Sequence, residues 1–129
     1  MPEPKPLISG RSRTIAYARA AGGTYPARDF LEGSDVPAKD KAALRRRIEL
    51  LAAEGRITNR EQFKKLSGEL WELKSYQVRI GCFQHGDAWY LTHGFIKKKD
   101  KWPKAQLERA EQIRLEHLEY LSRQRGRRA

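Results

Sequence analysis

The stretch from residue 71 to residue 96 constrains the fold most, because apolar and polar residues alternate along it. The runs 71–75, 76–82 and 88–96 each have the pattern of a β-strand. Residues 84–87, with the sequence QHGD, have the composition of a turn. Strands joined by such short connections pair in antiparallel order. The centre of the chain is therefore predicted to be an antiparallel meander.

Helical spacing appears upstream of the meander. Leu44, Ile48 and Leu51 recur at helical intervals with charged residues between them, which predicts a helix over residues 37–55. Gly55 is placed to end that helix, because glycine readily adopts the left-handed conformation found after a helix.

A second, short helix is predicted immediately afterwards. Residues 58–61, with the sequence TNRE, match a capping box, the pattern that begins many helices. Phe63, Leu66 and Leu70 then form its expected buried side.

A long helix is predicted downstream of the meander, from Pro103 to about Arg123. One face of this helix consists of Leu107, Ala110, Arg114, Leu118 and Leu121. The apolar part of that face is expected to pack on the sheet or on a partner.

The two ends of the chain are expected to lie outside the folded domain. Residues 1–12 are rich in proline and are predicted to be a flexible leader, and residues 122–129 a basic tail. Residues 13–20 alternate and predict a first strand within a single domain over residues 13–121. The resulting order, β-α-α-β-β-β-α, indicates an α+β fold in which helices pack on a small antiparallel sheet.

Charge points to the class of partner. The chain has a net charge of +11 and a pI of about 10.1, which favours nucleic acid, anionic lipid or an acidic protein as partner. From Lys97 onward there are eleven Lys and Arg against five acids, so this segment carries +6 of the net charge. A basic end that is merely solvated is the alternative interpretation.

The candidate binding residues lie around the end of the last predicted strand. Lys97, Lys98 and Lys99 end that strand, and Lys101 and Trp102 follow. Trp102 is expected to be the most accessible aromatic residue for stacking on an unpaired base. Lys74 and Arg79, on neighbouring strands, are expected to reach the same surface. The other aromatic residues considered for stacking are Trp71, Tyr76, Trp89 and Tyr90, of which Trp71 and Trp89 are expected to be core residues.

Familiar catalytic motifs are absent from the sequence, which predicts neither a cofactor nor a metal site. The single cysteine, Cys82, suits a reducing cytoplasm, and no apolar run is long enough to span a bilayer. His93 is most simply a structural residue within its strand. One reaction needs none of these motifs: RNA carries its own nucleophile, the 2′-hydroxyl. A lysine cluster can orient the strand, neutralise the charge that develops on phosphorus, and supply an acid and a base.

Four stretches resemble one known family when they are taken in order. They are RDFLEGS, LLAAEG, KKLSGELWELKSYQVRIGCF and LTHGFIKKKDKWPKAQLERA. From about Arg13 to about Leu121 the chain resembles the HigB-like branch of the RelE/ParE toxin superfamily, which comprises toxins of bacterial type II toxin–antitoxin modules and phage-derived relatives. The paired LWELK and HGFIKK signatures, followed by a proline and a helix, are the specific part of the match.

The resemblance implies a fold and an activity. The fold is a curved antiparallel sheet with helices packed on it. The activity is that of a cytoplasmic toxin that enters the ribosome and cleaves mRNA without a metal, through attack by the 2′-hydroxyl. The implied partners are the 70S ribosome, its mRNA and a cognate antitoxin, often of the helix-turn-helix type, and no membrane.

The resemblance also assigns residues. It places Lys74, Lys97 and Lys98 as catalytic candidates and Arg109 as an RNA-binding candidate. The charge pattern adds Arg79 to the catalytic candidates, and Lys99, Lys101 and Trp102 to the RNA-binding candidates. Gln77 stands where the family usually has an arginine, and Arg79 would present its guanidinium about 7 Å further along the strand.

This departure leaves two alternatives open. One is inhibition of DNA gyrase, as in ParE-type members of the superfamily. The other is a non-catalytic, phage-derived binding protein.

Overall fold

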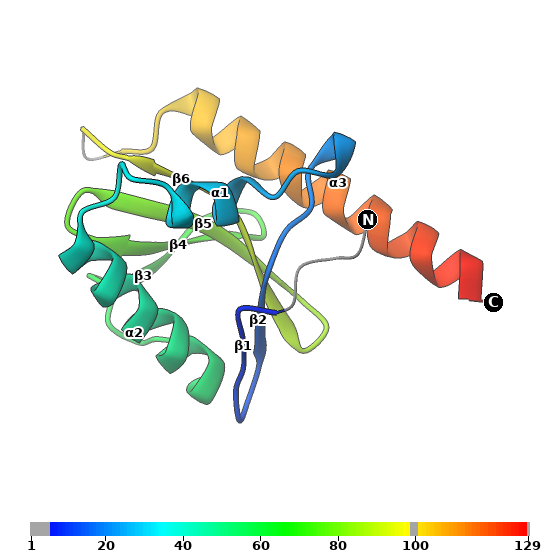
Figure 1. The fold of residues 1–129 in the computed structure, drawn as a ribbon, viewed down its shortest axis with the longest axis horizontal. Coiled ribbons are helices and arrows are strands. Elements are labelled where there is room, and N and C mark those ends of the chain that lie inside the picture. The colour runs from blue at the N-terminus through cyan, green and yellow to red at the C-terminus, as the bar shows by residue number, and fades with distance from the viewer. Residues whose placement is uncertain (1–5, 99–100, 129) are drawn as a thin grey trace.

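A six-stranded sheet lies at the centre of the computed structural model, which describes residues 6–98 and 101–128 (Figure 1). The strands are β1 (Ile8–Ser9), β2 (Thr14–Tyr17), β3 (Phe63–Ser67), β4 (Leu70–Ser75), β5 (Val78–His85) and β6 (Ala88–Ile96). The helices are the short 3-10 helix η1 (Ala21–Gly23), α1 (Pro26–Glu32), α2 (Ala38–Glu54) and α3 (Lys104–Arg128). This confirms the predicted α+β class.

The order of strands across the sheet is β1-β2-β6-β5-β4-β3. Strands β4, β5 and β6 are antiparallel neighbours, so the predicted meander is confirmed. Strand β2 pairs with β6 in parallel. A parallel pair requires a crossover, and the segment between the two strands, which includes α1 and α2, provides one. The sheet is therefore mixed, and not antiparallel throughout as predicted.

Helix α2 covers one face of the sheet. Its Leu44, Ile48 and Leu51 belong to the larger core cluster, together with Ile80 and Leu91 from the sheet. Gly55 follows the helix with a φ of 79°, and its amide donates to the carbonyl of Leu51. The predicted helix and its end are both confirmed.

Helix α3 covers the opposite face (Figure 1). Its Ala110 packs with Leu70 of β4, and its Ile113 packs with Phe83 of β5. Leu107, Ala110 and Leu118 of the expected apolar face pack against the sheet. The buried Ile113 and His117 were not part of that prediction. His117 is accommodated because its Nδ1 accepts a hydrogen bond of 2.8 Å from the amide of Arg19.

The second predicted helix is wrong, because its residues form a turn and strand β3. The side-chain oxygen of Asn59 accepts a hydrogen bond of 2.9 Å from the amide of Glu61, which folds residues 59–62 into a turn. Phe63 then pairs with Leu73 of β4. Pairing with β4 therefore outweighs the local capping pattern.

Other segments are more ordered than expected. Ile8 and Ser9, inside the predicted leader, form β1 against β2. The segment 21–30, for which no helix was predicted, contains η1 and most of α1, which begins at Pro26. Helix α3 continues to Arg128, through much of the predicted tail.

Candidate nucleic-acid interface

An irregularity in β6 decides which of its side chains face helix α3. Ile80 pairs with Gly94 and Cys82 with Leu91, so that Gly81 lies opposite two residues, Thr92 and His93. This is a β-bulge, and it shifts the alternation of β6 by one residue.

Glycine is required at position 81 by the crowding on the α3 side. A Cβ there would lie 2.5 Å from the Thr92 Oγ1 and 3.2 Å from the Trp102 ring. The bulge and this glycine together let Trp102 and helix α3 lie close to the sheet.

The bulge also aligns a row of residues at the end of the sheet. Lys74 pairs with Arg79, and Arg79 pairs with Phe95, so these three side chains share the α3 face. Lys97 follows two residues after Phe95, and its amide donates a hydrogen bond of 2.6 Å to the carbonyl of Gln77. Three predicted catalytic residues, Lys74, Arg79 and Lys97, therefore lie in one row, which we call the basic row.

A hollow of about 520 Å³ lies where β6 ends and α3 begins. We call it the Lys98 hollow; it is lined by Phe95, Ile96, Lys97, Lys98, Lys101, Trp102, Pro103 and Gln106. Lys98 and Lys101 are exposed and form no ion pair within the part of the chain that the structure describes, whereas Lys97 is only 9% exposed. The hollow thus brings together three of the predicted lysines. A fourth, Lys99, lies outside the described residues.

Arg79 is committed to contacts within the protein. Its Nε lies 3.1 Å from the Glu72 Oε1, and the two side chains are only 13% and 6% exposed. Its Nη1 also donates to the carbonyls of Tyr76 and Val78. Burial lowers the pKa of Arg79, and the nearby Glu72 carboxylate partly opposes that effect. The guanidinium predicted to replace the family arginine is thus largely neutralised by Glu72.

Trp102 is not the accessible aromatic residue that the sequence suggested. It is 7% exposed, and its ring meets Phe95 edge-on at 4.7 Å and packs with Leu70 and Ala110. The expectation that Trp102 is accessible is therefore wrong, and its buried ring offers no open face to a base. Tyr76 is the exposed aromatic residue here, with 80% of its surface accessible.

Tyr76 also has an unusual backbone. It lies in the tight turn between β4 and β5, with a φ of 52°, a conformation that favours glycine or asparagine. Its neighbour Gln77 bonds the backbone of Lys97, so the turn lies beside the lysine-bearing end of β6. The structure therefore places an exposed ring next to the basic row.

His93 lies behind the hollow and is 3% exposed. Its Nε2 donates a hydrogen bond of 2.8 Å to Gln106, and its ring stacks on Phe95. Burial lowers the pKa of His93 to about 4; the Gln106 hydrogen bond opposes this shift, and the charge of Arg109 adds to it. His93 is thus a neutral, structural residue at pH 7, as expected from the sequence. Arg109 itself is exposed, one helical turn after Gln106.

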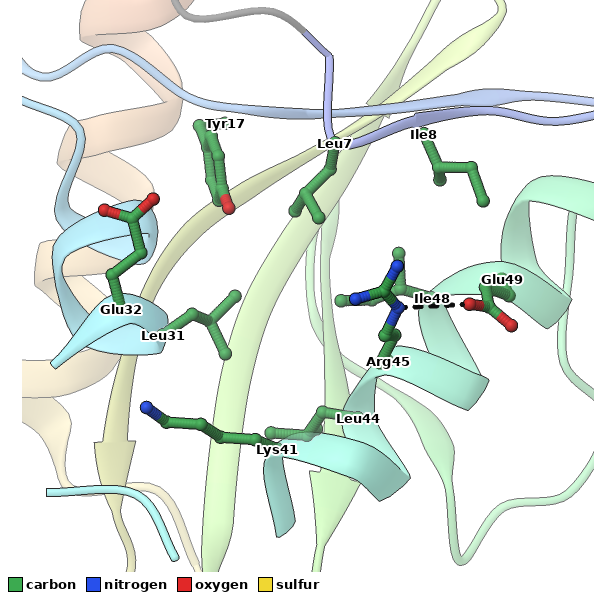
Figure 2. Close-up of a pocket in the computed structure, with 10 residues that line it drawn as sticks. All are labelled: Leu7, Ile8, Tyr17, Leu31, Glu32, Lys41, Leu44, Arg45, Ile48 and Glu49. Atoms are coloured by element: carbon green, nitrogen blue, oxygen red, sulfur yellow. Dashed lines mark hydrogen bonds and ion pairs between the residues drawn. The ribbon is translucent and has the colours of Figure 1, made fainter. Parts of the chain in front are cut away.

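A different hollow lies on the α2 side of the sheet (Figure 2). It has a volume of about 350 Å³ and lies between α1, α2 and the first two strands. Leu31, Leu44 and Ile48 contribute apolar side chains, and Arg45 and Glu49 form an ion pair of 3.3 Å at its rim. None of the predicted site residues lines it, so it is separate from the basic site.

Within residues 6–98 and 101–128, no group of three or more His, Cys, Asp or Glu side chains is placed to hold a metal ion. No helix in the same ranges combines the length and the apolar character needed to cross a membrane.

Sequence reasoning missed two residues that shape the site. Glu72 neutralises Arg79, and Gln106 holds His93. The alternation around Glu72 offered a signal, because it places this acid on the same strand face as Lys74. No comparable signal marked Gln106, whose role depends on the docking of α3.

The fold and site define a small α+β protein with a basic hollow at the end of its sheet. The chain belongs to the family of Gp49-like phage-derived proteins (DUF891), whose profile matches residues 32–115. That family belongs to the context of RelE- and HigB-type toxins, and is consistent with a toxin of a toxin–antitoxin module. No curated protein matches the chain.

Proposed function

We propose that the protein is the toxin of a type II toxin–antitoxin module and cleaves mRNA on the 70S ribosome without a metal. The observation that carries the proposal is the Lys98 hollow, where exposed lysines gather at a rigid strand end. Membership of a family with toxin relatives supports it. A cognate antitoxin, often with a helix-turn-helix, is the expected partner.

The proposed reaction is an internal transfer at phosphorus. The ribose 2′-oxygen attacks the adjacent phosphorus and loses its proton to a base, while the bond to the 5′-oxygen breaks and that oxygen takes up a proton. The products are a 2′,3′-cyclic phosphate and a 5′-hydroxyl. Charge builds up on the phosphoryl oxygens, and fixed cations are effective at stabilising it.

We assign roles from exposure. Lys98 faces the hollow and is solvent-accessible, so it is the first candidate to contact the reacting phosphate; Lys101 and Arg109 bind neighbouring phosphates. Lys74 and Lys97 complete the basic row and remain candidates for proton transfer. Arg79 we assign to positioning, because its contacts hold the turn beside the row.

The direct test is to induce the protein and to map new 5′-hydroxyl ends across translated mRNA. Cuts within translated codons and arrest of translation are expected. In Lys98→Ala the cleavage rate should fall about a hundredfold, a typical loss for one group that stabilises transition-state charge.

Lys39→Ala is the matched control, since Lys39 is exposed on α2 and does not line the hollow; it should stay fully active. Arrest of growth with intact mRNA would reject the nuclease proposal. A DNA-damage response in that case would instead favour gyrase as the target.

Tyr76 provides a second prediction, in which stability and activity change in opposite directions. Tyr76→Gly should raise the free energy of unfolding by about 1 kcal/mol, because glycine relieves the left-handed backbone. The same variant should lose about tenfold in RNA affinity, because it removes a ring on which a base stacks. Tyr76→Phe keeps the ring and should match the parent in both. Thermal melts and RNA titrations measure the two effects, and unchanged affinity in Tyr76→Gly would exclude stacking at this turn.

A further inference from the structure

A second basic hollow lies at the opposite side of the sheet, beside its edge strand. We call it the Trp71 hollow; its volume is about 330 Å³, and it is lined by Arg56, Ile57, Thr58, Arg60, Phe63, Lys64, Lys65 and Trp71. The lining includes four cations and no acid. All four cations are exposed, and none forms an ion pair within residues 6–98 and 101–128. The hollow is therefore a concentrated, unneutralised positive surface.

The aromatic side of the hollow is Trp71. Its ring stacks on Phe63 at 4.9 Å with an angle of 10° between the planes, and Trp89 meets it edge-on at 6.0 Å. Trp71 is half-buried, whereas Trp89 and Trp102 are 3% and 7% exposed. Trp71 is thus the one tryptophan that a ligand in solution reaches directly, and its neighbours hold the ring still.

Strand pairing brings a cation onto this ring. Lys65 pairs directly with Trp71 across β3 and β4, and its Nζ lies 5.9 Å from the ring centroid. This juxtaposition exists only because residues 63–67 form a strand; the helix predicted there from sequence would have set Lys65 on a solvated face.

Protection of the sheet edge does not account for all of these charges. Lysines on an exposed edge strand discourage pairing with other chains, and Lys64 and Lys65 serve that purpose in β3. Arg56 and Arg60, however, come from the segment between α2 and β3. Their convergence on the same hollow requires another explanation.

We infer that the Trp71 hollow binds single-stranded nucleic acid, with one unpaired base against Trp71 and flanking phosphates on Arg60 and Lys65. Single strands are held by this combination of stacking rings and cations. The hollow lies on the α2 face, to which Trp71 contributes, while Phe95 and Trp102 of the Lys98 hollow lie on the α3 face. The Trp71 hollow would therefore be a second nucleic-acid contact, independent of the proposed cleavage at the Lys98 hollow.

The test uses the full chain and a labelled single-stranded DNA of about 12 nucleotides, a length within the range of single-strand sites. Such DNA lacks the 2′-hydroxyl and is not cut by the proposed chemistry. Binding should quench tryptophan emission, and Trp71→Phe should abolish the quenching. The double variant Arg60→Gln/Lys65→Gln should lose about tenfold in affinity, and its slope of log affinity against log salt should be shallower by about 1.4.

The matched control is Lys39→Gln/Arg46→Gln, which removes two exposed cations of α2 that do not line the hollow. An equal loss in this control would overturn the inference, since only net charge would then matter. Unchanged emission at saturation, or equal affinity for duplex DNA, would also overturn it. Lys98→Ala separates the two proposals, because it should lower the rate of mRNA cleavage about a hundredfold and leave the quenching intact.

Discussion

Glu72→Leu is expected to lower the free energy of unfolding by about 3–5 kcal/mol, the usual cost of removing one partner from a buried ion pair. Glu72 and Arg79 are 6% and 13% exposed, and 3.1 Å separates their charged atoms. Without Glu72, the Arg79 guanidinium remains in the interior with an uncompensated charge. Chemical denaturation of the two proteins measures the difference.

The double variant Glu72→Leu/Arg79→Met should recover most of that loss, because no isolated charge remains. The exposed pair Arg45–Glu49 is the matched control, with side chains 82% and 50% exposed. Glu49→Gln should change the free energy of unfolding by less than about 0.5 kcal/mol. A small effect of Glu72→Leu alone would show that Arg79 reaches solvent without its partner.

The same double variant decides the role of Arg79 in cleavage. If Arg79 only positions the β4–β5 turn, a stable double variant retains measurable cleavage of mRNA. If cleavage disappears from a protein that remains folded, Arg79 takes part in the reaction itself and is not only a positioning residue. Measuring stability and cleavage on one protein is necessary, because Arg79 bonds the backbone of Tyr76 and a change in that turn affects both.

Features fixed by local sequence were predictable. The alternation in β4 to β6 and the helical spacing in α2 depend only on which side of each element is buried. Both could therefore be read from the local sequence, and both were confirmed. Strand β3 was not predictable in this way. Phe63 and Leu66 fit a helix as well as a strand, and the choice is made by the pairing of Phe63 with Leu73 of β4.

The site depended even more on non-local packing. Strict alternation along β6 would have placed Phe95 on the face of Trp89 and Leu91, but the bulge at Thr92 and His93 moves it to the α3 side. The ring of Trp102 then packs against Phe95, which buries it. Composition predicted that lysines gather after the end of β6. The register shift determines that the hollow they line also contains Phe95 and Trp102.

The two basic hollows differ in how visible their cations are in the sequence. The segment after residue 97 stands out because its cations are close in sequence. The Trp71 hollow gathers Arg56, Arg60 and Lys65 from a loop and a strand, and these are dispersed in sequence among ordinary polar residues. Exposed cations are thus gathered in hollows on two faces of one sheet. This arrangement suits a ligand that is larger than a single phosphate.

His93 should make the protein sensitive to acid. Its pKa is lowered to about 4 in the folded state, chiefly by burial, against 6.5 for an ordinary histidine. Well above pH 6.5 the ring is neutral in both the folded and the unfolded state, so its protonation does not change the free energy of unfolding. Between pH 6.5 and pH 4 the unfolded chain binds the proton and the folded chain does not, so stability falls as the pH falls. The total loss from this group is about 3 kcal/mol.

His93→Gln should remove this dependence, because glutamine does not titrate. The difference in free energy of unfolding between parent and variant should therefore vary with pH from 6.5 down to about 4 and level off on either side. His85→Gln is the matched control, since His85 is exposed in the β5–β6 turn, and its curve should follow that of the parent. A constant difference between parent and His93→Gln across this range would mean that the buried ring accepts a proton in place. The Lys98 hollow would then have to tolerate an additional positive charge directly behind its lysines.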